Sequence, residues 1–347
     1  MMQPMSQSMQ GMTQTLGGSA AGPAQAAMQP MLSRVADAVF WMSRYVERAE
    51  HLARLVLVNT HVLVDAGELA PELSRRFWND LMDIGRPVLK APAPPRPALD
   101  RQAIVQHLLF DVENRSSAVN CVARARENAR AIREIISAEM WECINSLYWA
   151  TRPDQVAQEE NPVELCRHIT TASFTFQGLT DQTITHGQAW LFASLGRYLE
   201  RIDMTCRIFC ARSTTLVETD ELLEPALRNI QWMALLRACC SIEVFRRSHG
   251  GDVHPSLVAE FIILRRSFPR SMYFCVAESL ESLRQLRGLV GGDGVDDFER
   301  ILGQLTARLQ YASVSEHSIK EIVQFVLEIN AATTAATAAM QERFFLR

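Results

Sequence analysis

The stretch from Ser33 to Val64 constrains the fold most, because it predicts a long helix that is apolar on most sides. Apolar residues recur along it at helical spacing, and a second apolar stripe contains Trp41 and Leu52. A helix of this kind lies inside a bundle rather than on its surface. We therefore expect Arg44 and Glu47, which lie on the remaining arc, to be at least half buried.

Helical spacing continues along the rest of the chain, and no run alternates with the two-residue period of a strand. The expected fold class is therefore all-α, a multi-helix bundle. Five prolines between residues 87 and 97 predict an exposed linker. After the first helix, helices are expected over residues 71–84, 100–110, 114–148, 161–177, 183–217, 221–248, 255–266, 268–288, 295–311 and 315–340.

The composition favours a soluble protein without a nucleic-acid or membrane partner. The 347 residues are 48% hydrophobic and carry a net charge of only −4 with the signs interspersed. No stretch reaches the roughly 18 uninterrupted apolar residues of a membrane-spanning helix. Eight cysteines without a CxxC pair indicate small buried side chains in a reducing cytoplasm. Residues 1–30 lack the basic start and apolar core of a signal peptide and predict a disordered tail.

Two separate helical patterns occur twice in the same order. The run Arg44-Tyr45-x-Glu47-Arg48 recurs as Arg197-Tyr198-x-Glu200-Arg201, about 150 residues further along. Downstream, the pattern that begins at Ser117 recurs from Ser271 at nearly the same offset. Its matching residues are Cys121, Val122, Ala123, Glu127, Arg130 and Arg133, which correspond to Cys275, Val276, Ala277, Glu281, Arg284 and Arg287.

The repeats predict an internally duplicated bundle with a pseudo-twofold repeat. We expect one helical domain over residues 31–347, with a first repeat at about residues 31–178 and a second at about 183–345. Such pseudo-symmetry tends to bring the two Arg-Tyr-x-Glu-Arg runs together in a shared interior.

Charged residues in and around the repeated runs are the candidate site. Within one helix, Arg44 can pair with Glu47, and Glu50 with Arg54. One interpretation is a buried ion network that holds the helices in register. The other is a polar pocket whose arginines bind a carboxylate, a phosphate or a peptide group. The candidate binding residues are Arg44, Glu47, Arg48, Glu50, Arg54, Glu127, Asn128, Arg130, Arg197, Glu200, Arg201, Asp203 and Arg207.

Other chemistries find less support in the sequence. Glu47 and Glu200 could act as a paired general acid and base, but the nearby arginines should keep both ionised. Glu47 and His51 share a helix face like two metal ligands, but the repeat has Met204 in place of the histidine, so no metal is expected. The chain has no GxxxxGK[ST] loop and no GxGxxG after a strand, and no cofactor is expected.

Four runs together carry a resemblance to a known family. They are Phe40-Trp41-Met42-Ser43-Arg44-Tyr45-Val46-Glu47-Arg48-Ala49-Glu50, Ala125-Arg126-Glu127-Asn128-Ala129-Arg130, Gly196-Arg197-Tyr198-Leu199-Glu200-Arg201 and Phe268-Pro269-Arg270-Ser271. From residue 31 onward the chain resembles the bacterial Alpha-E family, an all-helical domain named for its Glu-Arg motif. Met42-Ser43 departs from the family pattern, in which a Leu-Gly-like pair is expected at this place.

The resemblance implies a role beside another enzyme. Alpha-E proteins are associated with circularly permuted ATP-grasp ligases, and often with transglutaminase-like proteins and proteasome-related peptidases. The expected function is an accessory or binding subunit of an ATP-grasp-type amide or peptide ligase system, which binds a peptide or carboxylate-bearing intermediate or docks the ligase. The alternatives are a stand-alone enzyme acting on a peptide or amide through Glu47 and Glu200, and a structural adaptor.

Overall fold

The computed structural model describes residues 29–66, 71–85, 100–152, 162–219, 225–251, 253–291 and 296–346. Every regular element within these ranges is a helix, which confirms the all-α class. The predicted tail at residues 1–30, apart from residues 29 and 30, and the proline-rich segment at 87–97 lie outside the described residues. The helices are α1 (Ser33–Ala66), α2 (Pro71–Ile84), α3 (Arg101–Val105), a π-helical turn (Gln106–Phe110), α4 (Ala118–Ala131), α5 (Ala138–Ala150), α7 (Pro162–Thr183), α8 (Gln188–Thr219), α9 (Pro225–Ala238), α10 (Ile242–His249), α11 (Pro255–Leu264), α12 (Met272–Val290), α13 (Asp297–Gln310) and α14 (Ile319–Phe344).

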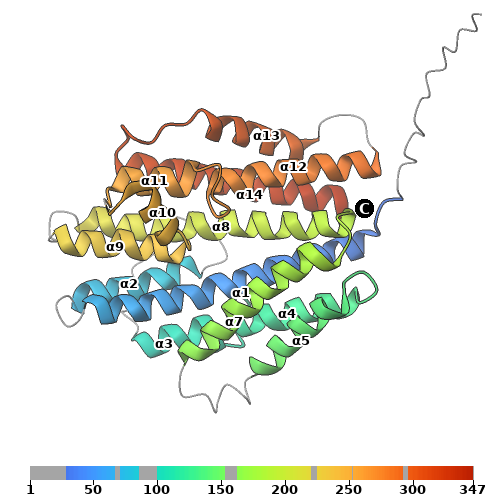
Figure 1. The fold of residues 1–347 in the computed structure, drawn as a ribbon, viewed down its shortest axis with the longest axis horizontal. Coiled ribbons are helices and arrows are strands. Elements are labelled where there is room, and N and C mark those ends of the chain that lie inside the picture. Colours follow the sequence, from blue (N-terminus) through green and yellow to red (C-terminus); the bar gives the residue numbers. More distant parts are fainter. Residues whose placement is uncertain are drawn as a thin grey trace, which may run out of the picture.

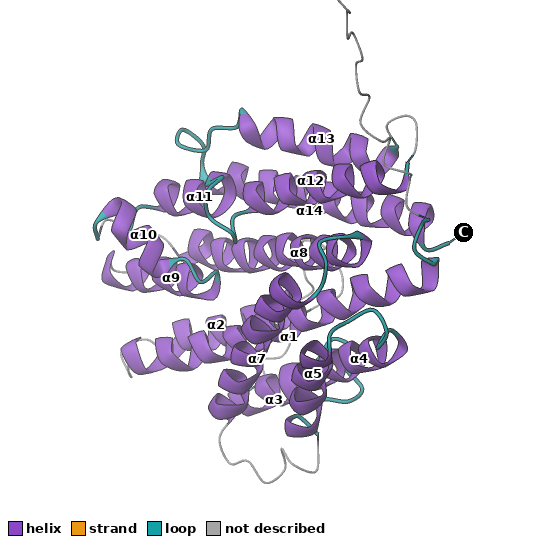
Figure 2. Ribbon diagram, turned by 45° about the vertical axis from the view of Figure 1, so that its right-hand side comes forward, coloured by secondary structure: helices purple, strands orange, loops and turns teal. Residues whose placement is uncertain are grey.

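Helices α1 and α8 lie against each other in the middle of the molecule (Figure 1). On one side, α4 and α7 pack on α1 and α5 packs on both of them; on the other, α12 and α14 pack on α8 and α13 packs on both of these. Helix α2 also contacts α8, and α9 contacts α1. Figure 2 shows the same order of layers from a second direction. The long helix that opens the sequence is therefore a central helix, as its apolar circumference predicts.

The two central helices approach each other closely at a glycine. A Cβ atom placed on Gly196 of α8 would lie 2.4 Å from the carbonyl oxygen of Phe40 and 3.2 Å from the Cβ of Ser43, both on α1. Only glycine therefore fits at this position without moving a backbone. The crossing lies within one turn of Arg44 and Arg197, so it places the two charged runs side by side.

Serine side chains cap the N-termini of several outer helices. Ser117 accepts a hydrogen bond from the backbone N–H of Asn120 at the start of α4, and Ser271 accepts one from Phe274 at the start of α12. Ser137 begins α5 in the same way. These hydroxyls satisfy backbone donors that the first helical turn leaves without a partner.

Two helix predictions are wrong, because the chain forms two shorter helices where one continuous helix was expected. The predicted helix at 114–148 is two helices, since Ile132 leaves helical geometry and Ser137 caps a new start. The predicted helix at 221–248 is also two, because Cys240 adopts a left-handed backbone conformation with φ of 53°. Here the N–H of Ser241 donates to the carbonyl of Leu236 and closes the end of α9. Neither break contains glycine or proline, so local composition does not reveal them.

A third prediction placed the helix boundary before α8 incorrectly. The helix predicted from 161 to 177 continues to Thr183, and α8 begins only at Gln188 rather than at residue 183. The residues of the connection, which include Gly187, complete the turn between these two helices.

Replacing Cys240 with glycine should raise the free energy of unfolding by about 1 kcal/mol, because a left-handed conformation costs a side-chain-bearing residue about that much. Urea denaturation of the two proteins would measure the difference. Cys143→Gly is the matched control. It places glycine inside α5 and should lower the free energy of unfolding. A loss of stability in Cys240→Gly would contradict the assignment of strain.

Among the described helices, only α14 is long and apolar enough to cross a membrane by length and composition. Buried core helices meet the same two criteria. One face of α14, which includes Val326, Ile329 and Met340, is buried, and the helix packs on α8 and α13. The absence of a membrane partner stays a prediction from the sequence.

Candidate functional site: a glutamate–arginine cluster and its groove

The side chain of Glu47 is fully buried and held by an arginine fork from α8. Arg201 donates from Nε to Oε1 at 2.6 Å and from Nη2 to Oε2 at 3.0 Å. Gln177 of α7 donates to Oε2 at 2.7 Å. Arg201 also donates to the backbone carbonyl of Pro269, which ties the pair to the segment before α12. Paired donors of this kind make the strongest carboxylate contacts in proteins.

The side chain of Glu200 is equally buried and is held by arginines of α1. Arg48 donates to Oε1 at 2.5 Å and to Oε2 at 3.0 Å, and Arg44 donates to Oε2 at 2.7 Å. The pairing is therefore reciprocal, since each central helix supplies a glutamate to an arginine of the other. We call Arg44, Glu47, Arg48, Glu200 and Arg201 the glutamate–arginine cluster.

The cluster corrects one pairing expected from the sequence. Arg44 does not pair with Glu47 one turn along its own helix, but with Glu200 of the facing helix. The expected pair of Glu50 with Arg54 does form. Local spacing predicts which residues can meet on one helix, but the choice among partners depends on the neighbouring helix.

A third buried carboxylate, Glu50, lies one turn along α1 from Glu47. It pairs with Arg54 and, at 3.3 Å, with Arg270, which precedes α12. The Nδ1 atom of His51 lies 3.4 Å from Glu50 and 2.8 Å from the backbone carbonyl of Glu47. Asp203, at the corresponding place on α8, accepts hydrogen bonds from Arg207 and from Asn330 of α14.

Arginine charges keep the buried carboxylates ionised. Burial alone would raise the pKa of Glu47, but Arg201 and Arg270 lower it to about 2. Burial likewise opposes ionisation of Glu200, but Arg48 and Arg44 lower its pKa to about 2. Neither group carries a proton near neutral pH, so neither can act there as a general acid without a large rearrangement.

These pKa shifts predict a loss of stability in acid. A carboxylate whose pKa is lowered by folding contributes stability that is fully present above its unfolded pKa, and this contribution is lost as the pH falls through its folded pKa. For Glu47 and Glu200 the loss should extend from about pH 5 to about pH 2. Burial lowers the pKa of His51, so its contribution acts in the same direction below its ordinary pKa of 6.5. Urea melts at several pH values would measure the slope, and a stability independent of pH over this interval would contradict the assignment.

Three potential metal ligands lie together but are surrounded by positive charge. Single ligand atoms of Glu47, Glu50 and His51 lie within 4.8 Å of one another. Arg201 and Arg270 already pair with these carboxylates, so a cation would have to displace guanidinium groups. The geometry therefore favours an ion-pair network at this point over a metal centre.

A groove of about 350 Å³ lies beside the half of the cluster that contains Glu200. Arg44 uses only its Nε on Glu200, and its two terminal nitrogens have no hydrogen-bond partner among the described residues. Arg48 likewise leaves Nη1 without one. The groove is lined by Trp41, Arg44 and Arg48 from α1, by Leu199, Asp203 and Arg207 from α8, and by Thr333, Thr334, Thr337, Ala338 and Gln341 from α14. Guanidinium donors facing a polar groove can bind a carboxylate.

Other predicted site residues lie apart from the cluster and its groove. Glu127 and Arg130 pair with each other on the surface of α4, where their side chains are 53% and 65% exposed. Asn128 on the same helix is half-buried. Arg197 lies next to the cluster in sequence, but its Nη1 is 3.5 Å from Asp181 of α7. The polar residues of α4 therefore do not take part in the arrangement around Glu47 and Glu200.

Sequence reasoning missed several residues of the site. Gln177 and Arg270 contact Glu47 or Glu50, and Thr334 and Gln341 line the groove. The threonines of α14 carry no charge signal, so nothing in the sequence alone assigns them to a groove. Arg270 could have been noticed in the sequence. It directly precedes Ser271, where the repeated pattern begins, whereas the first copy of the pattern has Ser116 in that place.

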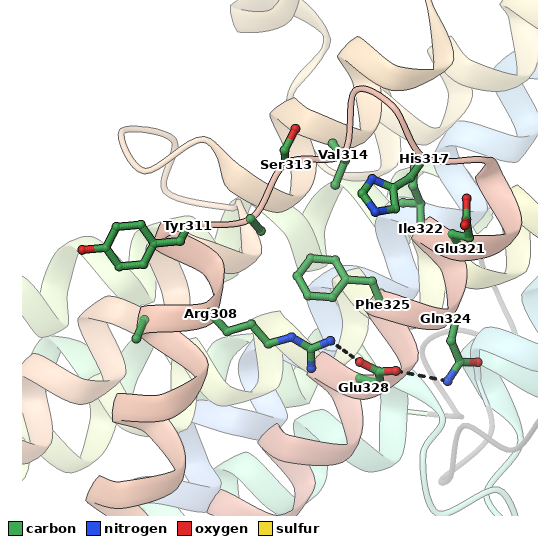
Figure 3. A pocket seen from close by; sticks show the side chains of 12 residues that line it. Arg308, Tyr311, Ser313, Val314, His317, Glu321, Ile322, Gln324, Phe325 and Glu328 are labelled. Carbon is green, nitrogen blue, oxygen red and sulfur yellow. Dashed lines mark hydrogen bonds and ion pairs between the residues drawn. The ribbon is translucent and has the colours of Figure 1, made fainter.

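A second hollow, of about 680 Å³, lies between the end of α13 and the start of α14, far from the cluster in sequence. Figure 3 shows the Phe325 ring and His317 facing it, while Tyr311 extends to the outside. Arg308 pairs with Glu328 along one side. None of these residues was predicted from the sequence as part of a site.

Comparison with protein families gives one match over almost the whole chain. The model of the Alpha-E family, described as a predicted alpha-helical domain with a conserved ER motif, matches residues 31–345. The chain is also similar to uncharacterized proteins of Mycobacterium bovis and of the CDC 1551 strain of Mycobacterium tuberculosis, each 26% identical over 303 residues. The alignments cover 82% of this chain but only 33% of those proteins, so the chain spans about a third of the length of these relatives. No solved structure matches.

Proposed function

Since the chain belongs to the Alpha-E family, we propose that it is a binding subunit of an ATP-grasp-type amide or peptide ligase system. Its groove would hold the carboxylate of a peptide or of a carboxylate-bearing intermediate. One observation carries this proposal. Beside Glu200, Arg44 and Arg48 line a groove large enough for a small ligand, and each keeps guanidinium nitrogens without a hydrogen-bond partner among the described residues.

Binding is better supported than catalysis by this chain alone. An acid–base pair would need either Glu47 or Glu200 to donate a proton, but the arginines hold both in the ionised form. The role of structural adaptor is supported for one part of the cluster, since Glu47 is fully enclosed by Arg201 and Gln177. The groove at Glu200 is what distinguishes a binding subunit from an adaptor.

The length of the relatives supports a role beside another protein module. The aligned region makes up only a third of the mycobacterial proteins, so the same helical unit occurs there joined to further sequence. In the proposed system the partner is a circularly permuted ATP-grasp ligase, which would supply the nucleotide chemistry. A transglutaminase-like protein or a proteasome-related peptidase would be a further partner, and the complex would act in the cytoplasm.

Internal duplication with a pseudo-twofold axis between α1 and α8 is part of the proposal. The reciprocal pairs Glu47 with Arg201 and Glu200 with Arg48 support it, because they join corresponding residues of the two repeats. The packing of α4, α5 and α7 around α1 corresponds in order to that of α12, α13 and α14 around α8. The contacts of α2 with α8 and of α9 with α1 correspond in the same way.

Co-purification tests this function directly. The tagged chain should retain a neighbouring ATP-grasp ligase through gel filtration, and mass spectrometry of the mixture should detect an amide product that depends on ATP. The chain alone should form no product. If the purified chain converted a peptide without ATP or ligase, the binding-subunit proposal would be wrong and the stand-alone enzyme would be favoured.

A further inference from the structure

The two repeats place similar charges around two sites, and one of the differences between the sites is the residue just before the helix-capping serine. Ser117 and Ser271 both cap the helix that follows them, so the residues just before them, Ser116 and Arg270, correspond. This correspondence rests on the duplication proposed above. Around the first site lie Glu47, Glu50, Arg54 and Arg201, and around the second lie Glu200, Asp203, Arg207 and Arg48.

In the first site the protein supplies its own guanidinium group. Arg270 is only 7% exposed, and its Nη1 atom lies 3.3 Å from Glu50 and 3.9 Å from Glu47. Its guanidinium carbon lies 5.8 Å from the centre of the Phe174 ring. The space beside these two carboxylates is therefore filled by a planar cation.

In the second site the corresponding residue is too short to fill that space. Ser116 lies at the edge of a cavity of about 60 Å³, whose wall also contains Asp203, the counterpart of Glu50. Arg48 and Arg207, the counterparts of Arg201 and Arg54, complete its polar part. The remaining wall is formed by Leu52, Ile84, Gly85 and Met204. The cavity can hold several water molecules or one guanidinium group.

The charges around the two sites indicate which further group a guanidinium ligand of this cavity would carry. The first site combines three arginines, Arg270 included, with two carboxylates. The second already has three arginines, because Arg44 also pairs with Glu200 there. Counted over these described residues, a lone cation would raise the net charge of the second site above that of the first, whereas a ligand that also carries a carboxylate leaves the two equal. The cavity and the groove share Arg48, Asp203 and Arg207 in their walls, so the two hollows are adjacent.

We infer that the second site binds a carboxylate ligand with a guanidinium group, such as an acylated arginine or a peptide that ends in arginine. The guanidinium occupies the cavity beside Ser116 and Asp203, in the position that Arg270 fills in the first site. The ligand carboxylate binds Arg44 and Arg48 in the groove. Arg270 shows which chemical group the first site accepts beside Glu47 and Glu50, the counterparts of Glu200 and Asp203. The inference deepens the proposed function, because it names the class of ligand for the same groove.

Calorimetric titration with N-acetyl-arginine and N-acetyl-citrulline tests the guanidinium directly, because citrulline has the same shape without the charge. We expect N-acetyl-arginine to bind at least about tenfold more tightly, since a hydrogen bond to a charged group is worth about that much. Equal affinities would overturn the guanidinium site and leave the proposed carboxylate groove intact. Binding of neither compound would overturn both.

A substitution at Ser116 provides the second test. Ser116→Arg should fill the cavity from within, as Arg270 does in the first site, and should abolish the preference for N-acetyl-arginine over N-acetyl-citrulline. Ser116→Ala should keep that preference. Thermal melts of both variants check folding, and if Ser116→Arg does not fold, the comparison of the two ligands on the unmodified chain decides. A folded Ser116→Arg protein that keeps the preference would contradict the inference.

Discussion

Replacing Glu47 by glutamine is expected to lower the free energy of unfolding by about 3–5 kcal/mol, the cost of removing one partner from a buried ion pair. The carboxylate is fully buried, and its loss would leave Arg201 and Arg270 with an uncompensated charge in the interior. Urea denaturation of both proteins at neutral pH would measure the loss. The same substitution should also flatten the decrease in stability between neutral and acidic pH.

Glu127→Gln is the matched control for this change. It removes the same charge from an arginine pair, but the side chains of Glu127 and Arg130 are largely exposed. Exposed pairs contribute little, so the free energy of unfolding should change by less than about 1 kcal/mol. Similar losses in Glu47→Gln and Glu127→Gln would show that the buried pair is not a main support of the fold.

Gly196→Ala should destabilise the protein by about 1–3 kcal/mol, the range for overpacking a well-packed core. The new methyl group would lie 2.4 Å from the carbonyl oxygen of Phe40, and because that atom is backbone, the central helices must move apart. The shift should also disturb the pairs of Glu47 and Glu200, which follow within about one turn of the crossing. Thermal melts and side-chain NMR signals of the arginines would report the two effects.

Gly178→Ala is the control with the opposite expected sign. Gly178 lies on the exposed side of α7, and a Cβ atom there would meet nothing within 4 Å. Alanine is the better helix former, so this variant should gain about 0.4–1 kcal/mol. Equal effects of the two substitutions would mean that the close approach at Gly196 does not limit the packing of α1 on α8.

Periodicity predicts the first two helices of this chain closely. The helix from Ser33 was expected to end near residue 64 and ends at Ala66, and the helix over Pro71–Ile84 has the predicted bounds. Breaks without glycine or proline were missed, at Ile132 before α5 and at Cys240 after α9. In both places the chain turns through residues that are compatible with a helix, so the composition of these segments does not mark the break.

The sequence predicted the main charged residues of the candidate site, but not the groove beside them. The repeated Arg-Tyr-x-Glu-Arg runs identify Glu47 and Glu200, and the geometry brings both together with Arg48 and Arg201. Sequence spacing could not tell that one half is enclosed while the other opens on a groove. That difference depends on side chains from other helices, such as Gln177 on α7 and the threonines of α14, and their place is decided only by the fold.

Titration of the purified chain with N-acetyl-arginine and with its C-terminal amide tests the central claim, that the groove beside Glu200 binds a carboxylate, most directly. The acid should bind and the amide should bind at least about tenfold more weakly. Arg44→Lys, which keeps the charge but loses the planar donors, should weaken binding of the acid, whereas Arg130→Lys on the exposed face of α4 should leave it unchanged. Equal affinities for acid and amide, or an acid that binds Arg44→Lys as tightly as the unmodified chain, would contradict the account.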